Sequence, residues 1–185
     1  MKYLLCLLGL MTVLSGCGGD PPELQTALEF RETLLKAQQC SFSAEITADY
    51  GDSVTEFSVT CLGNSSGELA FEITEPEAIA GIRGRISDAG GEIRFEEEAV
   101  FFPLMTDDHL SPASAPWIFL KTLRGGCITA VCREEDSLRL TADDRYDQDA
   151  LHLDIWFREN IPIRADISQN GRRFLSLNVK NFDLS

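Results

Sequence analysis

The stretch CSFSAEITADYGDSVTEFSVTC, residues 40–61, decides the fold class of this chain. Apolar side chains stand at every second position from Phe42 up to a turn at residues 50–53, and again on the way back to Cys61. A period of two is typical of a strand with one face in a core, and two such runs around a turn predict an antiparallel hairpin.

The same alternation continues toward the C-terminus, where turn residues separate the runs. The Asn170-Gly171 pair is a strong signal for a tight hairpin turn. Together these runs predict an antiparallel meander. Its further strands are expected at residues 68–74, 92–95, 99–102, 137–142, 150–158, 161–168 and 173–182, with a short one around 81–86.

Two segments have helical periodicity instead. Residues 23–38 place leucine and alanine on one face, and residues 117–123 are an apolar run between Pro116 and the Gly125-Gly126 pair. A sheet needs one face covered, and these helices are the natural covers. The sequence therefore predicts an α+β, mainly β fold: a curved antiparallel sheet or incomplete β-barrel, covered by an N-terminal helix and a short central helix.

The N-terminus has the features of an export signal. One lysine precedes an apolar run that is too short to span a bilayer, and Leu14-Ser15-Gly16-Cys17 follows it. This tetrapeptide resembles the lipobox of bacterial lipoproteins. We expect a signal peptide at 1–16, an acylated Cys17 with a tether over 17–22, and one domain over 23–185. The protein is then anchored through Cys17 on the extracytoplasmic face of the cell membrane.

The charge balance excludes one class of partner. The chain has 30 acidic and 16 basic residues, a net charge of −14. Nucleic-acid-binding domains need basic patches, so no nucleic-acid partner is expected, and anionic lipid headgroups should repel the surface. Membrane attachment then depends on the acyl chains.

Four cysteines remain after the anchor, and export makes disulfides possible. Folding the first hairpin about Tyr50-Gly51 sets Cys40 opposite Cys61, which favours that pairing and, by elimination, Cys127 with Cys132. Two buried free thiols at Cys40 and Cys61 are the alternative. No CxxC pair or closely spaced histidines are present, so no metal site or cofactor is expected.

The order of elements resembles the outer-membrane lipoprotein carrier family, the LolA and LolB proteins, over about residues 23–184. The resemblance depends on the helix before Ser41, on the apolar helix after Pro116, and on the ending from Ile161-Pro162-Ile163 through Asn178-Val179-Lys180-Asn181-Phe182. It implies an incomplete barrel whose concave side holds acyl chains, and no enzyme activity.

Candidate ligand contacts follow from the apolar segments. The Gly63-Asn64-Ser65-Ser66-Gly67 sequence spells G-x-S-x-G but lies between two expected strands, so a hairpin turn is favoured over a nucleophile elbow and no catalytic residue is assigned. We expect a lipid or lipopeptide ligand; the alternative is a solid core in a scaffold that binds another envelope protein. The apolar cavity would be lined by Phe101, Phe102, Leu104, Met105, Trp117, Phe119 and Leu120.

Overall fold

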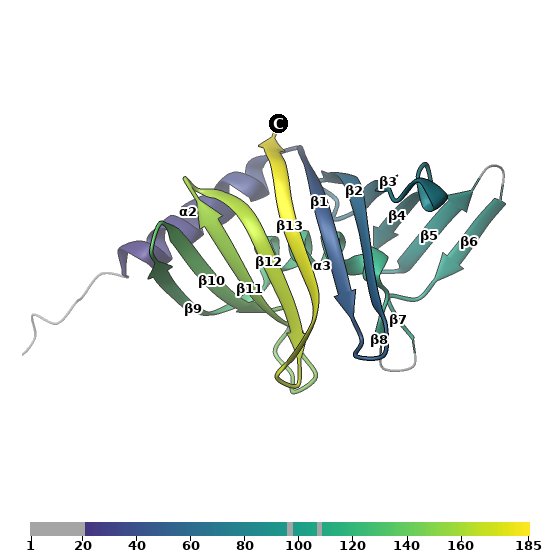
Figure 1. Ribbon diagram of the computed structural model, residues 1–185. Helices are drawn as coiled ribbons and strands as arrows, with labels where there is room; N and C mark the ends of the chain where they lie inside the picture. Colours follow the sequence, from purple (N-terminus) through teal and green to yellow (C-terminus); the bar gives the residue numbers. More distant parts are fainter. Residues whose placement is uncertain (1–20, 96–97, 107–108) are drawn as a thin grey trace, which may run out of the picture.

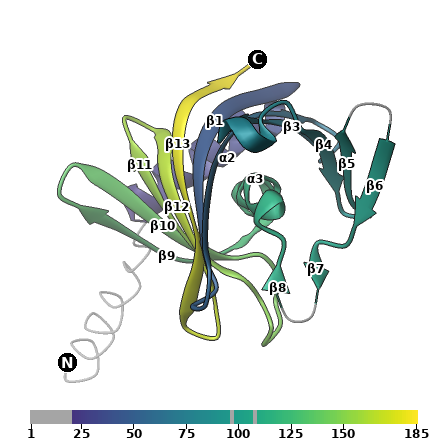
Figure 2. The same cartoon turned by 45° about the vertical axis from the view of Figure 1, so that its right-hand side comes forward.

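A computed structural model describes residues 21–95, 98–106 and 109–185. Its largest element is an antiparallel sheet of eleven strands in the order β6-β5-β4-β3-β2-β1-β13-β12-β11-β10-β9. The sheet curves strongly and stays open between β6 and β9 (Figures 1 and 2). The strands are β1 (Gln39–Asp49), β2 (Val54–Asn64), β3 (Leu69–Glu75), β4 (Arg83–Ser87), β5 (Gly90–Phe95), β6 (Glu98–Phe102), β9 (Cys127–Glu134), β10 (Ser137–Asp143), β11 (His152–Arg158), β12 (Ile161–Gln169) and β13 (Arg172–Leu184).

Two α-helices cover the inner face of this sheet. Helix α2 (Pro22–Lys36) packs Phe30 against Phe157 of β11, with ring centroids 5.0 Å apart. Helix α3 (Ala115–Gly125) lies inside the curve of the strands, as Figure 2 shows. The α+β fold class, mainly β with a curved and unclosed sheet, is therefore confirmed.

The remaining short elements lie around these helices. They are the 3-10 turns η1 (Glu77–Ile79) and η2 (Pro112–Ser114) and the two-stranded ladder β7 (Met105–Thr106) with β8 (His109–Leu110). The hydroxyl of Tyr50, at the end of β1, donates a hydrogen bond to the carbonyl oxygen of Leu110. This bond ties the segment before α3 to the first hairpin.

The first hairpin forms as expected, but its register differs from the expected one by two residues. The last pair is Asp49 with Val54, so four residues form the turn. The Asp49 carboxylate accepts a hydrogen bond from the amide of Gly51, whose φ of +93° suits glycine. This turn moves the hairpin axis along the chain and sets Phe42, not Cys40, opposite Cys61.

The alternation itself is confirmed in the core. Side chains of β1 and β2 that share the inner face are buried, and those between them are more exposed. Burial of this face at roughly 25 cal/mol per Å² drives the sheet to curve around α3. The inner residues of these two strands are Cys40, Phe42, Ala44, Ile46, Ala48, Phe57, Val59 and Cys61.

Candidate functional site

Helix α3 fills the centre of the concave side. Trp117, Phe119 and Leu120, which were expected to line a cavity, are all nearly inaccessible to solvent. The ring of Phe119 meets the ring of Phe42 edge-on, with centroids 5.6 Å apart. Gly63 of β2 lets the helix approach closely, because a Cβ there would lie only 2.3 Å from Leu120 Cδ2. These three side chains therefore belong to the buried core around α3; that they line a ligand cavity stays a prediction.

The other expected cavity residues are not gathered around α3. Leu104 and Phe102 are partly buried and pack against the core. Phe101 points to the other face of its strand and is 76% exposed. Met105 is placed in β7, but its side chain lies outside the described residues. Phe101 and Phe102 are neighbours in the apolar segment that was expected to line the cavity. Because they are consecutive residues of one strand, their side chains point to opposite faces of the sheet.

The apolar inner face continues beyond α3 onto the edge hairpin β5–β6. Ile93 pairs with Val100, and both lie in the row that starts at buried Phe71 and passes through Gly84. Side chains on one strand alternate between faces, so Phe95 and Phe102 share this inner face. We call Ile93, Phe95, Val100 and Phe102 the open wall.

Much of the open wall remains accessible to solvent. Phe95 is 60% exposed and Val100 is 62% exposed, whereas Ile93 and Phe102 are partly covered by the core. In Figure 2 the β5–β6 hairpin stands to one side of α3, at the open end of the curved sheet. The structure thus presents an uncovered apolar surface on the concave side, next to a packed core.

Two glycines shape the sheet beside this wall. A Cβ at Gly84 would lie 2.4 Å from the ring of Phe71, and one at Gly91 would lie 2.2 Å from the ring of Phe102. Each ring therefore lies directly over the backbone of the neighbouring strand. The space that a side chain at Gly84 or Gly91 would occupy on the inner face is filled instead by the aromatic ring of the neighbouring strand.

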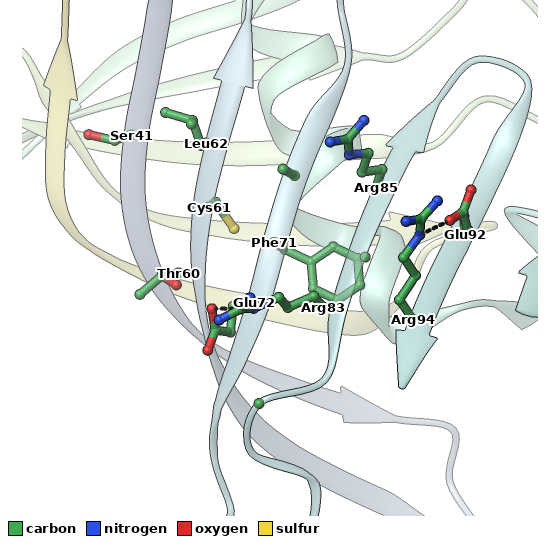
Figure 3. A pocket seen from close by; sticks show the side chains of 13 residues that line it. Ser41, Thr60, Cys61, Leu62, Phe71, Glu72, Arg83, Arg85, Glu92 and Arg94 are labelled. Atoms are coloured by element: carbon green, nitrogen blue, oxygen red, sulfur yellow. Dashed lines mark hydrogen bonds and ion pairs between the residues drawn. The ribbon is translucent and has the colours of Figure 1, made fainter. Parts of the chain in front are cut away.

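The outer face of strands β2 to β5 carries a groove of about 720 Å³ (Figure 3). Its arginines pair with carboxylates: Arg83 Nε lies 2.9 Å from Glu72 Oε2 on the adjacent strand β3, and Arg94 pairs with Glu92 on its own strand β5. Arg85 Nη1 lies 3.9 Å from Glu68 Oε1. Exposed pairs of this kind contribute little to stability, and their charges cancel. With Glu68 beside the groove, its three arginines are balanced by three carboxylates, so no excess positive charge would select an anionic ligand.

All four cysteines of the described domain are free thiols. Because of the register, Cys40 and Cys61 are diagonal rather than opposite, at about 7–8 Å between Cα atoms, which exceeds the usual span of a disulfide. Cys127 and Cys132 lie five residues apart on one strand, about 16 Å at the usual rise, and cannot pair. Both expected disulfides are therefore absent.

Burial controls the chemistry of the inner thiols. Desolvation raises the pKa of Cys40 to about 12, an effect that the nearby Arg124 partly offsets. Desolvation also raises the pKa of Cys61. These thiols are neutral at physiological pH and behave as small apolar core residues.

The described part of the chain can be checked for a nucleophile elbow, a metal site and a membrane-spanning helix. Residues 63–67 run from the end of β2 into the turn before β3, where the Asn64 side-chain oxygen accepts hydrogen bonds from the amides of Ser66 and Glu68. Among described residues no group of three potential metal ligands occurs. No helix in the described ranges is both long and apolar enough to cross a bilayer. The expected signal peptide and Cys17 lie outside the described residues.

Comparison with known proteins gives fold neighbours only. No protein family matches the sequence, and no curated protein does. Solved structures similar to this chain include an uncharacterized conserved protein from Thermus thermophilus (13% identity, 88% of this chain and 87% of that chain, TM-score 0.48). A LolA superfamily protein from Nitrosomonas europaea is also similar (10% identity, 86% and 93% covered, TM-score 0.48).

A third similar structure is the lipoprotein LppX of Mycobacterium tuberculosis (12% identity, 89% and 96% covered, TM-score 0.44). The family that the order of elements resembles is thus represented among the structural neighbours. The function is argued below from the side chains of this chain.

Proposed function

We propose that this chain is a lipid-anchored extracytoplasmic lipoprotein that binds the apolar part of a lipid or an acylated molecule on the open wall, without catalysis. The exposure of Val100 and Phe95 on the concave side is the observation that carries this proposal. An apolar chain laid along β5 and β6 would remove both side chains from water. Phe95 is 60% and Val100 62% exposed, so covering these parts would contribute roughly 2–4 kcal/mol in total, which corresponds to a weak complex with a Kd of about 1 mM or above.

The membrane anchor is a separate part of the proposal. Acylation of Cys17 after cleavage of residues 1–16 would hold the domain, over 23–185, at the extracytoplasmic face through the tether 17–22. A net charge of −14 keeps the surface of the domain away from anionic headgroups. The open wall would then receive single lipid molecules while the domain itself stays outside the bilayer.

A direct test uses the mature chain from residue 17 with Cys17→Ser, which prevents acylation. Titration with the uncharged apolar fluorescent probe N-phenyl-1-naphthylamine should give saturable binding. Val100→Asp places a charge in the open wall and should weaken binding about tenfold or more, since about 1.4 kcal/mol is a factor of ten.

The matched control is Val54→Asp, because Val54 is also 62% exposed but lies at the start of β2, outside the open wall. This variant should bind the probe like the parent. Equal affinity of the parent and the Val100→Asp variant would contradict the proposal.

A second candidate function is docking of another envelope protein at the sheet edge. Strand β6 ends the sheet, so its outer edge has unpaired backbone groups, and its outward Phe101 is 76% exposed. If this edge is the functional surface, Phe101→Ser should abolish cross-linking to a partner in intact cells and leave probe binding unchanged. Unchanged cross-linking in this variant would exclude the edge as the docking site.

A further inference from the structure

A small pocket lies at the other side of α3, where the helix meets the end of α2 and the turn between β2 and β3. Its volume is about 310 Å³, at the low end for ligand sites. Its floor and walls are mostly apolar, but two cationic side chains enter it. We call it the basic pocket; it is lined by Leu35, Gly67, Trp117, Leu120, Lys121 and Arg124.

The spacing on α3 places the important side chains together. Trp117, Lys121 and Arg124 stand at positions i, i+4 and i+7, so they share one face of the helix. The indole Nε1 of Trp117 donates a hydrogen bond to the carbonyl oxygen of Gly67 at 2.9 Å, which fixes the ring at the pocket. Lys121 Nζ lies 4.7 Å from the centre of that ring.

Arg124 is incompletely satisfied by the protein. Its Nη1 donates to the carbonyl oxygen of Asn64 at 2.7 Å, whereas its Nη2 is buried and has no hydrogen-bond partner among the described residues. No ion pair within the described ranges involves Arg124, although exposed arginines such as Arg83 pair with carboxylates. A buried guanidinium nitrogen without an acceptor costs free energy that a bound anion would recover.

Lys121 supplies a second, more accessible charge. It is 44% exposed and pairs with Asp88 at 2.7 Å, while Asp88 is 80% exposed on the β4–β5 turn. An exposed pair of this kind is weak, so an incoming anion can replace Asp88 at little cost. The two cations then face a bound anion from adjacent turns of one helix.

We infer that the basic pocket binds the anionic group of an amphiphile, a carboxylate or phosphate joined to an aliphatic chain. On binding, the Arg124 guanidinium turns its buried Nη2 toward the anionic oxygens and donates to them. Lys121 adds a second charge, and the first methylenes lie against Leu35, Leu120 and Trp117. The apolar lining distinguishes this ligand from a free inorganic anion, which would leave those surfaces unused. The site does not depend on the open wall, because none of its lining residues belongs to that wall.

The test uses Trp117 as its reporter. The chain has two tryptophans, so Trp156→Phe in the unacylated mature protein leaves Trp117 alone. Decanoate, kept below its micelle concentration, should change the Trp117 emission with saturation. Decanol, which has the chain without the charge, and inorganic phosphate, which has the charge without the chain, should each bind at least tenfold more weakly.

Substitutions identify the donors. Arg124→Gln should weaken decanoate binding at least tenfold, and Arg124→Lys should restore part of it. Arg133→Gln, at an exposed arginine of β9, is the control and should bind like the parent. If Arg124→Gln fails to fold, as judged by circular dichroism, Lys121→Gln takes its place and should lose affinity about threefold.

Each contrary result overturns the inference. Decanol binding as tightly as decanoate would exclude an anion site, phosphate binding as tightly would exclude an amphiphile, and full affinity in both Arg124→Gln and Lys121→Gln would exclude these donors. Val100→Asp should leave the Trp117 response unchanged. A failure of the open wall is therefore distinguishable from a failure of the basic pocket.

Discussion

Seating α3 directly on β2 requires that position 63 have no side chain, and this requirement is open to a stability test. In Gly63→Ala the new Cβ would lie 2.3 Å from Leu120 Cδ2. Leu120 is only 2% exposed, so its side chain can yield only toward the basic pocket that it lines. Overpacking of a core costs about 1–3 kcal/mol.

One further term sets the expected magnitude. Alanine in a strand is favoured over glycine by roughly 0.5–1 kcal/mol, which offsets part of the clash. We therefore expect Gly63→Ala to lower the free energy of unfolding by about 1–2 kcal/mol. Leu120→Ala alone should cost about 2–5 kcal/mol, because it leaves a cavity in the core.

The double variant Gly63→Ala with Leu120→Ala is the decisive one. The added methyl group enters space that the truncated leucine has left, so the double variant should be more stable than the sum of the single effects by about 1 kcal/mol or more. Urea unfolding followed by circular dichroism gives the three free energies. Gly125→Ala is the control, since a Cβ there meets nothing within 4 Å, and it should not destabilise the protein.

Strictly additive effects of the two substitutions would refute the reasoning. They would mean that Leu120 does not lie over Gly63 and that α3 is not seated as described.

Further predictions concern the thiols and the N-terminal helix. Burial raises the pKa of Cys40 from 9.0 to about 12. Below pH 9 the thiol is neutral in both the folded and the unfolded protein, so its contribution to stability is complete. Above pH 9 the thiol of the unfolded protein ionises first, so the free energy of unfolding falls until about pH 12. Cys40→Ala should reduce that slope in urea titrations between pH 8 and 11, and an unchanged slope would argue against a buried thiol. In α2, Leu34 is fully buried and its neighbour Leu35 is exposed. Leu34→Ala should therefore cost about 2–5 kcal/mol in the free energy of unfolding and Leu35→Ala less than about 0.5 kcal/mol, whereas equal losses would contradict the placement of the helix.

The sequence was a good guide wherever one periodicity governed a whole segment. The alternation from Phe42 onward predicted β1 and β2, and the apolar run after Pro116 predicted α3. It was a poor guide to register, because the side chain of Asp49 and the positive φ of Gly51 fix the turn, and neither is visible as periodicity. The expected disulfide between Cys40 and Cys61 depended on the expected register, and the observed register places the two cysteines diagonally.

Two other features depended on tertiary contacts. Strand β9 (Cys127–Glu134) has no clear alternation, since it lies at an edge of the sheet and both its faces are partly covered, so it was not predicted. Its two cysteines had been paired by elimination, and the strand holds them apart. A filled and a hollow interior need the same inward apolar residues. Whether Trp117 and Phe119 fill the interior or line a cavity was therefore not predictable from the sequence. The pocket that Arg124 and Lys121 line could not be predicted, because its other walls come from α2 and from the β2–β3 turn, which are distant in the sequence.

Photo-cross-linking with a diazirine-labelled long-chain alcohol, which lacks the charge that the basic pocket selects, tests the open wall most directly. After irradiation of the unacylated mature protein and proteolysis, mass spectrometry locates the labelled peptides. The account predicts adducts on β5 and β6, which an excess of unlabelled alcohol removes and Val100→Asp reduces. Labels absent from both strands, with adducts confined to other surfaces, would contradict the claim that this edge of the concave face receives an apolar chain.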